Sequence, residues 1–126
     1  MQDLKFTKTH EWVKQTQNEI LIGITDHAQQ LLGDLVFIEL PAIGKNITAG
    51  DELGVLESVK AAADFYAPVS GTVIAINHEA STNPALINQD PYGNGWLIKL
   101  QISDPRELNN LLTHEHYMQQ ISEDHE

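Results

Sequence analysis

The chain has 126 residues, a length that one domain with one core commonly has, and 41% of them are hydrophobic, which argues against disorder of the whole chain. It has no cysteine, which excludes disulfides, thiolate metal sites and cysteine nucleophiles, so that any thiol chemistry must come from an added cofactor. The net charge of −11 argues against nucleic acid and anionic membranes as partners, and no apolar run has the length of a bilayer span.

The first third of the chain predicts strands around one short helix. Residues 5–14 read as an extended segment, and the alternating isoleucines of 20–25 predict a strand. A short helix is expected near 26–32, because a threonine that can cap its start and a glycine just past its end enclose it. Residues 35–40 predict a second strand, which Pro41 stops.

Beyond Pro41 the glycines separate short apolar runs, which predicts several short strands joined by turns. A last strand is expected at 95–100. Pro105 then starts a predicted C-terminal helix near 105–120, and residues 122–126 read as a frayed acidic tail. The fold class predicted is mainly β, a single domain over 1–126 built as a sandwich or flattened barrel of two antiparallel sheets.

Lys60 lies near the middle of a nearly symmetric segment. Gly50 precedes it by ten residues and Gly71 follows it by eleven, and an apolar arm runs in from each glycine. This pattern predicts a hairpin with its tip near Lys60. A lysine at a hairpin tip is ordinarily a solubility residue, and spacing alone favours that interpretation.

Three features argue for a modified amine instead. Lysine is scarce in this chain, small residues follow at 61–63, and carboxylates flank the site at Glu57 and Asp64. A swinging carrier needs an exposed attachment amine on a rigid backbone, and a tight hairpin supplies both. Glu57, Ser58 and Asp64 are therefore the candidates for recognition by a modifying enzyme.

The segment Glu57-Ser58-Val59-Lys60-Ala61 resembles the lipoylation site of the H protein family of the glycine cleavage system. The resemblance covers roughly residues 6 to 117. It continues through an ordered series of further motifs: Thr9-His10-Glu11-Trp12-Val13, residues 23–29, Leu32-Gly33-Asp34, residues 36–41, Asn83-Pro84, residues 86–88, Asp90-Pro91-Tyr92-Gly93, residues 95–99 and Ser103-Asp104-Pro105. The series is far more specific than any one of its motifs.

The resemblance implies a lipoyl-domain fold and a covalent lipoyl group on Lys60. It implies a carrier, not an enzyme, that takes the aminomethyl group of glycine from the glycine decarboxylase (P protein) to the aminomethyltransferase (T protein). Dihydrolipoamide dehydrogenase (L protein) would then reoxidise it, and a lipoate ligase or lipoyl transferase would load it. The hard chemistry belongs to the cofactors.

Protection of the cationic aminomethyl group implies a surface cleft that holds the arm. Glu11 and Asp64 are the candidate acceptors for its ammonium group, Thr9 is the hydroxyl partner, and Leu31 is a candidate lining residue. For Glu11 and Asp64 the simpler interpretation is a solvated charge. A surface ion pair made by such a group would contribute only ~0–1 kcal/mol to the stability of the fold. For Leu31 it is a buried helix residue.

Other interpretations stay open. A biotin carrier shares the hairpin lysine but usually flanks it with methionines, whereas Val59 and Ala61 stand here. A lipoyl relay that passes lipoate to other enzymes would have an identical site. No catalytic triad or phosphate loop indicates an independent enzyme, and the histidines predict no metal site. A cytoplasmic protein is expected, since the N-terminal residues resemble neither a signal nor a transit peptide, and a monomer is preferred because a carrier must dock several partners in turn. A mature mitochondrial form is less favoured.

Overall fold

The structure, a computed structural model, describes residues 3–124 and places nine strands among them. The strands are β1 (Leu4–Phe6), β2 (Glu11–Thr16), β3 (Glu19–Ile24), β4 (Leu35–Glu39), β5 (Asn46–Ile47), β6 (Glu52–Ser58), β7 (Ala62–Tyr66), β8 (Gly71–Ile76) and β9 (Ile98–Ile102). The helices are α1 (Asp26–Leu32), α2 (His78–Thr82), α3 (Ala85–Gln89), the 3₁₀ helix η1 (Pro105–Asn110) and α4 (His114–Asp124).

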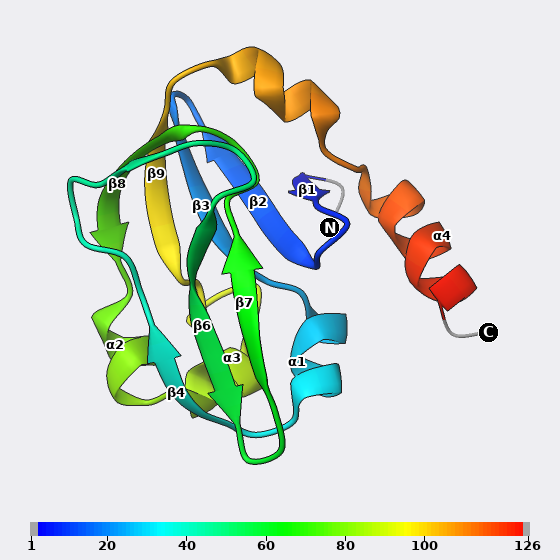
Figure 1. The fold of residues 1–126 in the computed structure, drawn as a ribbon. Coiled ribbons are helices and arrows are strands. Elements are labelled where there is room, and N and C mark those ends of the chain that lie inside the picture. The colour runs from blue at the N-terminus through cyan, green and yellow to red at the C-terminus, as the bar shows by residue number, and fades with distance from the viewer. Residues whose placement is uncertain (1–2, 125–126) are drawn as a thin grey trace.

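The strands form two antiparallel sheets. One has six strands in the order β1-β2-β3-β9-β8-β5, and the other has three in the order β4-β6-β7. Figure 1 shows the three-stranded sheet lying across the larger one, with α1 beside β7 at one end. The predicted fold class, mainly β with two antiparallel sheets and short helices, is confirmed.

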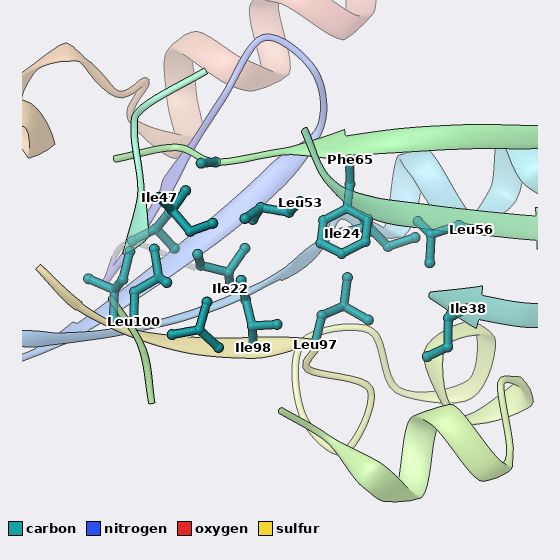
Figure 2. Close-up of a cluster of buried hydrophobic side chains, with 14 of the residues drawn as sticks. Ile22, Ile24, Ile38, Ile47, Leu53, Leu56, Phe65, Leu97, Ile98 and Leu100 are labelled. Atoms are coloured by element: carbon teal, nitrogen blue, oxygen red, sulfur yellow. The ribbon is translucent and has the colours of Figure 1, made fainter. Parts of the chain in front are cut away.

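The core fills the space between the two sheets. Alternate residues of β3 point into it, and Ile22 and Ile24 are 0% and 2% exposed. Leu56 and Phe65 close it from the opposite sheet (Figure 2). Period-two alternation places these side chains on one face of each strand, and their removal from water is the main stabilising contribution, at about 25 cal/mol per Å² of apolar surface.

The β6–β7 hairpin carries the predicted tip. Leu56 pairs with Ala63 and Glu57 with Ala62, so the strands meet just before the turn that holds Lys60. On the other side of β6, Ile38 pairs with Leu56, which leaves β6 flanked on both edges. The hairpin prediction is confirmed, and the two neighbours of β6 make its backbone a firm support.

Two short helices, α2 and α3, were not predicted, because only short strands joined by turns were expected between Pro41 and the last strand. α2 is capped by the side chain of Asn77, which accepts from the Ala80 backbone N–H. α3 follows directly and buries Ile87 completely. Helices of five residues are too short to show a 3.6-residue period in the sequence. Whether they form depends on the burial of their side chains against the rest of the fold.

The prediction of a single C-terminal helix near 105–120 is corrected by the structure. The segment forms η1, then a break, then α4. In the break, Leu112 makes a β-bridge with Phe6, and the two backbones exchange hydrogen bonds of 2.8 and 2.7 Å. This long-range pairing outweighs the local helical pattern. The frayed tail over 122–126 stays a prediction: α4 continues to Asp124, and residues 125–126 lie outside the described residues.

Within residues 3–124, none of the helices combines the length and the apolar character needed to span a membrane.

Candidate attachment site and adjoining cleft

Lys60 lies in the turn between β6 and β7 and is exposed. Ser58 holds this turn closed. Its Oγ accepts from the backbone N–H groups of Lys60 (3.2 Å) and Ala61 (3.0 Å), and donates to the Ala61 carbonyl (3.1 Å). The Ser58 N–H also donates to the Ala61 carbonyl, at 2.7 Å. The turn therefore presents an exposed amine on a hydrogen-bonded backbone.

The loop after α1 supports the tip from outside the hairpin. The Val59 N–H donates to the Asp34 carbonyl at 3.1 Å. Asn88 on α3 fixes that loop in turn, since its Nδ2 donates to the Gly33 carbonyl (2.9 Å) and its Oδ1 accepts from the Leu35 N–H (3.0 Å). The tip is thus tied to α3 through two short segments.

Gly33 has a φ of +83°, a conformation that suits glycine at a helix end. A Cβ added there would lie 3.4 Å from Cε of Lys60. The aliphatic part of the Lys60 side chain therefore runs past the end of α1. This helix also forms one wall of a cavity beside the hairpin.

A cavity of about 160 Å³ lies between α1 and the hairpin. The four predicted cleft residues, Thr9, Glu11, Leu31 and Asp64, all line it, and much of the remaining lining is apolar. Pockets for drug-sized molecules are usually ~300 Å³ or larger, so this one suits a slender chain. The structure brings together the lining residues from the β1–β2 turn, α1 and the hairpin.

Glu11 is 1% exposed, so the alternative of a solvated charge is wrong for this residue. Its Oε1 accepts from the hydroxyls of Thr7 (2.5 Å) and Thr9, and its Oε2 accepts from the Tyr66 N–H at 3.2 Å. Burial raises the pKa of Glu11, and the hydrogen bonds from Thr7, Thr9 and Tyr66 oppose that rise.

The raised pKa of Glu11 makes the stability of the fold depend on pH. Above the ordinary pKa of 4.5 the folded state holds a proton on Glu11 more readily than the unfolded state does. The contribution of this group to stability is therefore complete below 4.5 and is lost as pH rises through the folded pKa. A Glu11→Gln variant lacks this dependence. Urea unfolding across pH 4 to 8 is expected to show the difference wild type minus variant falling with pH, and a constant or rising difference would contradict the assignment.

The other predicted residues divide between the cavity and the opposite face. Leu31 is 54% exposed at the rim of the cavity, so the expectation of a buried helix residue was wrong. Asp64 is exposed and raises the pKa of its neighbour Glu52 by charge repulsion. Glu57 is exposed on the outer face of the hairpin and does not line the cavity.

Sequence reasoning named Thr9 as the hydroxyl partner but missed the other two partners of Glu11, Thr7 and the Tyr66 amide. Thr7 and Thr9 precede it at alternate positions, a spacing that places hydroxyls around a carboxylate and could have been read as a signal. The amide of Tyr66 comes from a strand far along the chain. Nothing local indicates that contact.

His10 belongs to a network at the edge of this site. Its backbone has a φ of +75°, and its Nδ1 lies 2.7 Å from the hydroxyl of Tyr117 on α4. The same hydroxyl lies 2.7 Å from Oγ1 of Thr25, which caps α1. α4 is thereby linked to the start of α1. Among the residues that the structure describes, no group of three histidine, aspartate or glutamate side chains could hold a metal ion.

A larger hollow of about 470 Å³ lies on the other side of Thr9 and Glu11. It is lined by residues such as Phe6, Pro68 and Leu111. No residue of α1 lines it, whereas α1 lines the smaller cavity and is followed by Gly33, next to the side chain of Lys60.

The chain matches the sequence profile of a family described as Glycine cleavage H-protein over residues 4–124. It is 59% identical over 124 residues to the glycine cleavage system H protein of Legionella pneumophila (strain Corby), covering 98% of this chain and 99% of the relative. The corresponding protein of Carboxydothermus hydrogenoformans is 55% identical over 124 residues, with 98% and 95% covered. The crystal structure of a glycine cleavage system H protein from Mycobacterium marinum superposes with a TM-score of 0.87 at 36% identity, covering 97% and 98% of the two chains.

Proposed function

Because this chain belongs to the glycine cleavage H-protein family, whose members are lipoyl carriers and not catalysts, we propose that Lys60 is the residue that carries its lipoyl group. The observation that carries the proposal is an exposed lysine on a hydrogen-bonded turn with a narrow cleft beside it. Of the described lysines, only Lys60 lies at the tip of this hairpin.

The residues present fit a lipoyl group in length and in chemistry. From Cα of Lys60 to the ring carbon that bears the first sulfur of a lipoyl amide, the extended arm measures roughly 14 Å, at ~1.25 Å per bond along the chain. A strand rises about 3.3 Å per residue, so Asp64 lies roughly 10–13 Å from Lys60 along β7. An arm folded back over β7 therefore ends at the level of Asp64, which lines the same cavity as Glu11.

When bound, the lipoyl group supplies the disulfide that takes up the aminomethyl group of glycine. The chain's own residues then bind and shield. Leu31 and Ala63 offer apolar surface to the arm, and Glu11, with Thr9 beside it, offers an acceptor to an ammonium group at its end. Water is displaced from the amine by these side chains, which favours retention of the aminomethyl group.

The family implies three partner enzymes, the P, T and L proteins of the glycine cleavage system. We extend this to a lipoate ligase or lipoyl transferase that loads Lys60, and to a monomeric carrier, since each partner must reach the same arm in turn. We propose the cytoplasm as its compartment, because the relatives are bacterial and the chain has no cysteine.

Peptide mapping of the loaded protein tests the proposal. Incubation with a lipoate ligase, lipoate and ATP is expected to add roughly 188 Da, all of it on the peptide that contains Lys60. An addition near 226 Da from cells supplied with biotin would support a biotinyl carrier instead. Modification of another lysine would overturn the assignment.

A further inference from the structure

Three large apolar side chains stand exposed on one side of the hairpin tip. Val36 and Phe37 on β4 are 55% and 50% exposed, and Val59 in the turn is 72% exposed. We call these three residues the tip patch. Exposed apolar side chains that lie singly need no explanation, but a group beside a functional residue indicates a contact surface.

Strand register places the tip patch on the outer face of the small sheet. Leu35 pairs with Ser58 and Phe37 with Glu57, and the bulge between these pairs adds Val36. Leu35 and Ile38 point into the core, whereas Val36 and Phe37 face water. Val59 follows Ser58 directly, so its side chain lies at the end of the same face. The cleft lies on the α1 side of the hairpin, and β4 lies on the other (Figure 1).

Carboxylates surround this apolar surface. Asp34, Glu39 and Glu57 are all exposed, and Glu57 stands directly opposite Phe37. Lys60 is the one basic residue in the stretch from Asp34 to Glu39 and from Glu52 to Tyr66. An apolar centre with an acidic rim complements a partner surface that is apolar at its centre and rich in lysine and arginine at its edge.

The possible partner enzymes differ in how close they must come to the hairpin tip, because they act on different atoms of the Lys60 side chain. An enzyme that acts on Nζ of Lys60 must bring its active site to within ~6 Å of the Lys60 Cα, five bonds away. Its surface must therefore cover the tip. An enzyme that acts on the end of the loaded arm can stay roughly 14 Å away.

We propose that the tip patch is the docking surface for the enzyme that attaches the lipoyl group to Lys60, an inference that rests on the function proposed above. That enzyme presents an activated lipoyl acyl donor, an adenylate or a thioester. An amide bond forms between Nζ and the acyl carbon, and the acyl–oxygen or acyl–sulfur bond breaks. The leaving group takes the electron pair, and Nζ releases a proton to solvent.

The test uses the full unloaded chain with the substitutions Phe37→Ser and Val59→Ser. Ile43→Ser is the matched control, since Ile43 is 58% exposed in the turn between β4 and β5, outside the tip patch. Attachment is followed by intact mass with a lipoate ligase, lipoate and ATP. Each tip-patch variant is expected to lose about tenfold or more in kcat/KM, and the control less than about twofold.

Each variant is then loaded to completion and assayed for glycine cleavage with purified partners. Unchanged turnover of loaded Phe37→Ser and Val59→Ser supports a surface specific to attachment. Normal attachment by both variants overturns the inference, and so does an equal loss in attachment and in turnover. If the unsubstituted chain takes its lipoyl group on another residue, it is the proposed function that fails. Circular dichroism and unfolding midpoints show that the variants are folded.

Discussion

The Lys60→Arg protein is expected to take up no lipoyl group and to support glycine cleavage only at the level of a reaction without the chain. A guanidinium group stays protonated at any pH at which the fold persists, so it has no free electron pair for acyl transfer. Lys60 is exposed and its backbone makes the contacts of the turn, so the substitution is expected to change the free energy of unfolding by less than ~0.5 kcal/mol.

The matched control is Lys45→Arg. Lys45 is also exposed but lies in the turn before β5, outside the hairpin. It should be loaded and should turn over as the unsubstituted chain does. Intact mass and carbon dioxide release from labelled glycine are the two measurements. Retained cleavage by Lys60→Arg, with the variant folded, would refute the role of Lys60.

The hairpin and its lysine could be predicted because their determinants are local. Glycines at 50 and 71 and two apolar arms mark a turn near the middle, and the observed pairing of Glu57 with Ala62 agrees with it. Lys60 itself stood out through its neighbours, which resemble one family. The strands of the core follow from alternation such as that of Ile20, Ile22 and Ile24.

What sequence could not supply are the contacts between distant segments. The expected C-terminal helix is broken because Leu112 pairs with Phe6, more than a hundred residues away. Leu31 is exposed because a cavity separates its side chain on α1 from the hairpin. Glu11 is buried because β7 brings the Tyr66 amide to it. Each of these outcomes depends on a contact between two elements that are far apart in the chain. A short segment of sequence does not contain that information.

Removing the charge of Glu11 is expected to shorten the life of the loaded form. In a Glu11→Gln variant that carries an aminomethylated arm, release of the aminomethyl group to water is expected to be about 10–100 times faster. A hydrogen bond to a charged group contributes ~1.5–3 kcal/mol, and 1.36 kcal/mol corresponds to tenfold. Glutamine keeps the volume of the side chain and an oxygen for Thr7 and Thr9, but its NH2 group loses the hydrogen bond from the Tyr66 N–H, so circular dichroism and unfolding midpoints check that the variant is folded.

Glu57→Gln is the control, because it removes an exposed carboxylate from the outer face of the same hairpin. Release is followed as formaldehyde and ammonia over time from isolated loaded protein, which separates retention from catalysis by the partners. Equal release rates in Glu11→Gln and Glu57→Gln would show that a general loss of negative charge, and not the buried acceptor, controls retention.

The pH dependence of release provides a sharper test of the same contact. Burial holds the pKa of Glu11 above its ordinary value, and an ammonium group brought next to it favours the ionised carboxylate. Binding of the amine and loss of the proton are thus coupled. As pH falls through the Glu11 pKa, the unsubstituted protein should release its aminomethyl group faster and approach the rate of Glu11→Gln. Parallel pH profiles for the two proteins would exclude an ion pair at Glu11.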